Sequence, residues 1–141
     1  MKNFLTFITH HWALWGALVS VIILLIIEET RKIVQGVAKI PANKAVDLIN
    51  REDAVVIDIR EANKFNDGHI IGSINIANSE IENNINKLTK YKDKPIIVVC
   101  NLGQSAIKAG SRLKKHGFTK VFSISGGIAE WQKSNLPLVK N

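Results

Sequence analysis

Cys100 is the residue in this sequence whose side chain is best suited to covalent chemistry. It is the single cysteine among 141 residues, which excludes an intramolecular disulfide framework and a cysteine-rich zinc or iron–sulfur site. A thiolate is a strong nucleophile, whereas a buried thiol behaves as a small apolar side chain. The segments on either side of Cys100 decide between these two interpretations.

The residues around Cys100 predict a strand, a tight loop and a helix. The run PIIVV at 95–99 is typical of a buried strand, and a helix is expected over 106–116. The carboxyl ends of parallel strands face the ligand crevice, and unpaired N–H groups at the start of a helix favour a thiolate. We therefore predict a catalytic Cys100 followed by a backbone binding loop of Asn101, Leu102, Gly103, Gln104 and Ser105. Ser105 has a second interpretation as the N-cap of the helix.

Polar residues after the strand expected at 54–58 are assigned to support rather than to catalysis. Asp58 and Arg60, together with Glu61, are expected to form a structural ion-pair network beneath the edge of the sheet. His69 is expected to be a hydrogen-bonded loop residue. The sequence offers no convincing pairing of Cys100 with a histidine base.

A basic stretch follows the cysteine loop. Residues 101–127 contain no aspartate or glutamate, and Lys108, Arg112 and Lys115 share one face of the predicted helix. The plain interpretation is a solvated helix face. The functional alternative is attraction of an anionic substrate, an acidic partner protein at the membrane or anionic headgroups. No nucleic acid is expected as a partner, because no binding motif or aromatic-interleaved basic stripe accompanies the charge.

The elements that must position these residues alternate between short apolar runs and helical patterns. This alternation predicts one α/β domain over 37–141, with a mostly parallel central sheet flanked by helices. A composition of 46% apolar and 22% charged residues is that of a folded protein, and the length allows one such domain. Strands are expected at 37–40, 54–58, 70–76, 95–99 and 121–124, and helices at 41–49, 81–88, 106–116 and 128–133.

An apolar segment precedes this domain. Residues 3–27 carry no formal charge and cover roughly 37 Å as a helix, against about 30 Å of membrane hydrocarbon. We predict a tail at 1–3, a transmembrane helix at 4–27 in contact with membrane lipid, and a linker at 28–36. Trp12 and Trp15 are typical of an interfacial belt. A cleaved secretory signal is the alternative, but no small-x-small cleavage site precedes Glu28.

Basic residues near the predicted span favour a cytoplasmic domain. Lys2 lies on one side, whereas Arg31, Lys32, Lys39 and Lys44 lie on the other, and the more positive side usually stays inside. The single cysteine also suits a reducing compartment.

Three motifs carry a resemblance to a known family. In family order they are VVIDIREANKFNDGHIIGSINI at 55–76, VVCNLGQSA at 98–106 and FSISGGIAEW at 122–131. They resemble the rhodanese homology domain, and the anchor plus domain resembles small, membrane-anchored, single-domain rhodanese-like proteins of bacteria. The resemblance implies a single-pass protein of the bacterial inner membrane.

The resemblance also implies sulfurtransferase activity. Cys100 would take sulfur from a sulfane-sulfur donor, hold it as a persulfide within the loop of residues 101–105, and pass it to a thiol or another nucleophilic acceptor. No metal or organic cofactor is implied. The loop departs from the commoner family pattern, because Ser105 stands where arginine is often found. Weak turnover of thiosulfate, a small dianion, is therefore expected.

Two rival functions use the same fold. A phosphatase with a Cys-x5-Arg loop needs an arginine to hold phosphate, and this sequence has Ala106 at that place. A membrane-tethered interaction module, with little or no catalysis and a vestigial cysteine, is the other rival, because a fold does not fix a function.

Overall fold

The chain consists of two units, which residue contacts separate as Met1–Ile33 and Val34–Asn141. The computed structural model describes the backbone of all 141 residues and the side chains of residues 1–31 and 36–141. The side chain of Lys32, one of the predicted flanking charges, lies outside this described part. The two units are described separately.

The first unit contains two helices, α1 (Lys2–His10) and α2 (Trp12–Gln35). The sequence predicts one helix over 4–27, and the structure divides the helical stretch at His11, whose φ of −116° leaves the helical region. Helix α2 continues through most of the predicted linker, because the first glycine after Ile27 is Gly36 and no proline intervenes. Residues Trp12–Arg31 are long and apolar enough to cross a membrane, and none of the side chains in their most apolar window is buried.

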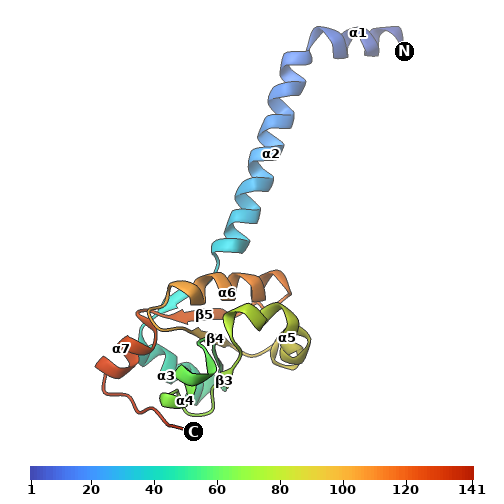
Figure 1. Cartoon of the computed structure of the whole chain (residues 1–141). Helices are drawn as coiled ribbons and strands as arrows, with labels where there is room; N and C mark the ends of the chain where they lie inside the picture. The colour runs from blue at the N-terminus through green and yellow to red at the C-terminus, as the bar shows by residue number, and fades with distance from the viewer. The chain divides into compact units, whose positions relative to one another are not determined.

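The second unit is built on a five-stranded sheet with the order β1-β5-β4-β2-β3 (Figure 1). Every neighbouring pair is parallel. Strand β4 is central, and all of its residues are buried because helices cover both faces of the sheet. The strands are β1 (Ala38–Ile40), β2 (Val55–Asp58), β3 (Ile74–Asn75), β4 (Ile96–Val99) and β5 (Val121–Ile124).

Two apolar cores lie on the two faces of the sheet. Ile57 and Val98 point to a core that includes Ile81 and Leu113 of the helices on one face. Val56 and Ile97 alternate with them and point to a core that includes Trp131 on the other face. Figure 1 shows α5 and α6 on the first face and α3 and α7 on the second. The helices are α3 (Ala42–Glu52), α4 (Ala62–Asp67), α5 (Ile81–Leu88), α6 (Gln104–Lys115) and α7 (Gly127–Lys133), with short 3-10 turns at η1 (Asn78–Glu80) and η2 (Thr89–Tyr91).

The register brings the carboxyl ends of the strands to one edge. Asp58 of β2 pairs with Val99 of β4, and the next residue, Ile59, donates its N–H to the Val99 carbonyl oxygen at 2.9 Å. Cys100 therefore enters this edge beside the segment that follows β2.

The predicted fold class is confirmed, and the local differences have simple causes. The extended piece expected at 70–76 is a strand only over Ile74–Asn75, because Gly72, with a φ of +77°, forms a turn before it. Helix α4 has a single buried residue, Phe65, and so leaves no periodic signal. Helix α6 begins at Gln104 with Gly103 as its N-cap, so the interpretation of Ser105 as the cap is wrong.

Candidate active site

Cys100 lies directly after β4, where its side chain meets the start of α6. The residue is 6% exposed. Its Sγ atom accepts a hydrogen bond from the backbone N–H of Gly103 at a distance of 2.9 Å. This N–H and the start of α6 lie where they can stabilise negative charge that develops on sulfur during a reaction.

The loop can aim this N–H at sulfur because Gly103 adopts a left-handed conformation, with a φ of +96°. A Cβ atom at this position would also lie only 3.2 Å from the Ile124 carbonyl oxygen and 3.3 Å from the Gly126 nitrogen. Glycine is therefore favoured here by both conformation and space.

A pair of glycines after β5 also supports the cysteine loop as a brace. Gly126 and Gly127 have φ values of +78° and +61°. A Cβ atom on Gly127 would lie 2.3 Å from the Cys100 carbonyl oxygen, which is closer than such contacts ever come. The first turn of α7 completes this brace, because Ile128 N–H donates to the Cys100 carbonyl at 3.0 Å and Ala129 N–H donates to the Asn101 carbonyl at 3.3 Å.

Sequence reasoning placed these glycines only within the motif at 122–131, before the helix expected at 128–133, and did not predict the brace. The signal was present in the adjacent pair of glycines directly after a strand, since two residues of this type together indicate a backbone that must pass close to another.

The Cys100 hollow is a cavity of about 320 Å³ beside this loop. Cys100, Asn101 and Ser105 form one wall. The opposite wall consists of Arg60 and Glu61, which follow β2, and of Lys64 in α4. Ile59 and Asn78 complete the lining. Three of the predicted loop residues do not line the hollow: Leu102, which is 66% exposed, Gly103, which is buried, and Gln104, whose side chain is exposed. Lys64 was not among the predicted site residues.

Arg60 and Asp58 form a two-pronged ion pair at the base of the opposite wall. The Arg60 Nη2 atom lies 2.7 Å from Asp58 Oδ2, and its Nε atom lies 3.0 Å from Oδ1. The same Nη2 donates to the Gly68 carbonyl oxygen at 2.7 Å. Glu61 is exposed and forms no ion pair with any side chain that the structure describes, so the expected network is reduced to this pair.

His69 is a hydrogen-bonded loop residue, as the sequence indicates. Its ring is buried and stacked on Phe65, with 3.8 Å between the ring centroids, and its Nδ1 atom lies 2.8 Å from the Phe65 carbonyl oxygen. Its backbone forms a bridge with Val139. His69 does not line the Cys100 hollow.

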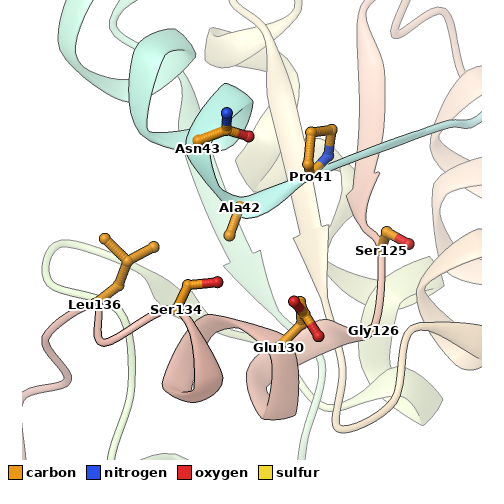
Figure 2. Close-up of a pocket in the computed structure, with 8 residues that line it drawn as sticks. All are labelled: Pro41, Ala42, Asn43, Ser125, Gly126, Glu130, Ser134 and Leu136. Atoms are coloured by element: carbon orange, nitrogen blue, oxygen red, sulfur yellow. The ribbon is translucent and has the colours of Figure 1, made fainter.

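A second hollow, of about 500 Å³, opens at the same edge of the sheet after β1 and β5 (Figure 2). Glu130 is the one charged residue in its lining, alongside the hydroxyls of Ser125 and Ser134. This hollow does not contain Cys100. Among the side chains that the structure describes, no group of three or more histidine, cysteine, aspartate or glutamate residues could hold a metal ion.

This arrangement of a parallel sheet, a cysteine after its central strand and a braced loop agrees with the comparison to known families. Residues 41–134 match the family described as "Rhodanese-like domain". The chain belongs to the rhodanese-like domain family. The rhodanese-like domain accounts for the whole edge described above, because Cys100, the Asp58–Arg60 pair and the glycine brace all fall inside the matched residues.

Similar proteins cover either the whole chain or the rhodanese-like domain alone. The Uncharacterized protein YibN of Escherichia coli (strain K12) is 39% identical over 141 residues, which cover 99% of each chain. The Thiosulfate sulfurtransferase GlpE of Pseudoalteromonas translucida is 38% identical over 89 residues, 63% of this chain and 83% of that protein. A solved structure of a rhodanese-related protein from Thermoplasma volcanium has a TM-score of 0.66 and 30% identity, and it covers 74% of this chain and 99% of that one.

Proposed function

We propose that this rhodanese-like chain is a membrane-anchored sulfurtransferase that carries sulfane sulfur as a persulfide on Cys100. The observation that carries the proposal is the Gly103 N–H placed 2.9 Å from Cys100 Sγ beside an open hollow. At the level of the family, a sulfurtransferase-like function is supported by the thiosulfate sulfurtransferases among the relatives.

Sulfur transfer proceeds by two displacements. The Cys100 thiolate attacks the sulfane sulfur of the donor, so an Sγ–S bond forms while the donor's own bond to that sulfur breaks and its electron pair leaves with the donor. A nucleophilic acceptor, such as a thiolate, then attacks the outer sulfur. The Sγ–S bond breaks and Cys100 returns as a thiolate, so the two steps together need neither an external oxidant nor a reductant.

The residues around Cys100 fit these steps without a dedicated general base. A thiolate needs no proton removed before it attacks, which agrees with the position of His69 outside the hollow. The N–H of Gly103 stabilises negative charge on the Cys100 sulfur both before the attack and after the outer sulfur has passed to the acceptor.

The Cys100 hollow offers little positive charge to an anionic sulfur donor. The guanidinium of Arg60 is already paired with Asp58, and the remaining charges in the lining, Glu61 and Lys64, have opposite signs. Ser105, which lies on the cysteine wall, supplies no charge. We therefore propose that thiosulfate is a weak donor for this protein.

Replacing Ser105 by arginine is expected to lower the apparent KM for thiosulfate about tenfold, the equivalent of roughly 1.4 kcal/mol for one charge-assisted contact. The gain should shrink as salt is added. Steady-state sulfur transfer measures it, with Ser105→Gln as the control for side-chain size and Ser105→Ala expected to change transfer less than about threefold. An unchanged KM in Ser105→Arg would show that this wall does not contact the donor.

The proposed anchor is the apolar helix at the start of the chain. Residues Trp12–Arg31 are long and apolar enough to span a bilayer, and the similarity to YibN extends over this segment as well as over the domain. We place the span in the bacterial inner membrane with the rhodanese-like domain in the cytoplasm, since basic residues are more numerous on the domain side.

Protease added to intact spheroplasts is expected to leave the domain undigested, and the same protease should digest it after lysis. Immunoblotting for the domain gives the readout. The lysed sample controls for intrinsic resistance to the protease. Digestion in intact spheroplasts would reverse the proposed orientation.

A further inference from the structure

A basic hollow is lined by residues of α6 and by Val37 and Lys39 at the start of the domain. It has a volume of about 670 Å³, and four cationic side chains line it: Lys39 of β1 and Lys108, Arg112 and Lys115 of α6. No acidic residue belongs to its lining, and it shares no residue with the Cys100 hollow. This α6 basic hollow is therefore a separate concentration of positive charge.

The cations of this hollow are partly preorganised. Lys39, Lys108 and Lys115 are exposed, whereas Arg112 is half-buried and donates to the Asn78 carbonyl oxygen at 3.3 Å. Val37 and Ile107 give the hollow an apolar floor. Such a lining suits a phosphate that is attached to a carbon chain. The cationic side chains can bind the phosphate, and the apolar side chains can contact the carbon chain.

The place of the hollow in the chain ties it to the anchor. Lys114 Nζ donates to the Gly36 carbonyl oxygen, and Val37 packs so closely on α6 that a Cβ atom at Gly110 would lie 2.9 Å from its side chain. Arg31, the last residue of the candidate span, precedes Val37 by six positions, which reach at most roughly 20 Å. The hollow therefore begins only a short stretch of chain after the proposed span.

We propose that the α6 basic hollow binds the phosphate of an anionic lipid headgroup and so holds the domain against the membrane. The proposal rests on the membrane anchoring in the proposed function and is independent of the sulfur chemistry. A cytoplasmic leaflet carries negative surface charge, and lysines and arginines that lie within its field are attracted to it.

Lysine reactivity in the full-length protein tests this proposal. The chain is inserted into nanodiscs of phosphatidylcholine, or of phosphatidylcholine with roughly one phosphatidylglycerol in three lipids, and treated with an uncharged acetylating reagent. Mass spectrometry should show acetylation of Lys39, Lys108 and Lys115 at least about threefold slower on the anionic nanodiscs, with recovery at high salt. Lys44 and Lys133, on the helices of the opposite face of the sheet, should react equally on both.

Two double charge-reversal variants distinguish binding in the α6 basic hollow from a general effect of net charge. In Lys108→Glu with Lys115→Glu, the slower acetylation of Lys39 should disappear. In Lys44→Glu with Lys133→Glu, which changes the net charge equally, it should persist. Inorganic phosphate added to the phosphatidylcholine nanodiscs should give no protection.

Three results would overturn the proposal. Equal acetylation on both kinds of nanodisc excludes headgroup binding while leaving the anchor and the sulfur chemistry intact. Protection by inorganic phosphate alone would assign the hollow to a soluble anion. A chain that does not stay with the nanodiscs would overturn both this proposal and the membrane anchoring.

Discussion

Replacing Cys100 by serine is expected to abolish sulfur transfer, with a loss of at least about a thousandfold. A serine hydroxyl is un-ionised in this position and cannot hold sulfur as a persulfide. The effect should be chemical and not structural, because serine is nearly the same size and its oxygen can still accept the hydrogen bond from Gly103. The free energy of unfolding should therefore change by less than about 1 kcal/mol.

Mass spectrometry of the intact chain gives the direct measurement. After exposure to a sulfane-sulfur donor, the unaltered protein should gain the mass of one sulfur atom, and transfer of that sulfur to a thiol acceptor should remove it. Cys100→Ser should gain nothing. Several donors are needed, because thiosulfate is expected to be a poor one.

The contrary result has a definite meaning. If the unaltered protein takes up no sulfur from any donor, or if Cys100→Ser transfers sulfur equally well, the sulfurtransferase proposal fails. The rhodanese-like domain would then act as a membrane-tethered interaction module, with Cys100 as a buried residue of the fold.

Replacing Gly127 by alanine is the substitution outside the cysteine itself with the largest expected effect. The added Cβ atom would lie 2.3 Å from the Cys100 carbonyl oxygen and 2.7 Å from that of Asn101, and both are backbone atoms that cannot rotate away. The loop must therefore shift, and the hydrogen bond from Gly103 to sulfur shifts with it. We expect a loss of about 3 kcal/mol in the free energy of unfolding and at least a tenfold loss of transfer.

Gly72→Ala is the matched control. Gly72 also has a positive φ, of +77°, but a Cβ atom there would meet nothing within 4 Å. The Gly72→Ala substitution should lower the free energy of unfolding by about 1 kcal/mol, because of backbone strain alone, and should leave sulfur transfer unchanged. Urea unfolding and transfer assays on both variants give the comparison. Equal behaviour of the two variants would show that the brace beneath the cysteine loop has no role beyond its backbone conformation.

The parts of the fold that could be predicted from the sequence are those with a strong local pattern. Ile81, Ile85 and Leu88 fall on one helical face, and all three are buried in α5 as the spacing indicates. The unbroken apolar run before Cys100 likewise predicts a buried strand, and β4 is buried throughout.

The parts that could not be predicted depend on contacts between distant segments. The brace formed by Gly127 is visible only when β5 lies beside β4, since the atoms that it touches belong to Cys100 and Asn101. Lys64 reaches the Cys100 hollow because α4 follows β2 at the same edge, and α4 is too short to give a periodic signal. Glu61 was expected in an ion pair on sequence proximity alone, whereas Arg60 satisfies its donors with Asp58 and a backbone carbonyl.

The order of strands in the sheet also determines when each pair of strands can form as the chain is synthesised. Strand β1 is made first, yet its partner in the sheet is β5, which is made last, as the pairing of Ala38 with Phe122 shows. Closing so long a loop is entropically costly, so we expect β1 to pair with β5 late in folding. Until then the backbone groups of β1 lack this partner. Because β1 has only three residues, its unpaired edge is a poor template for aggregation.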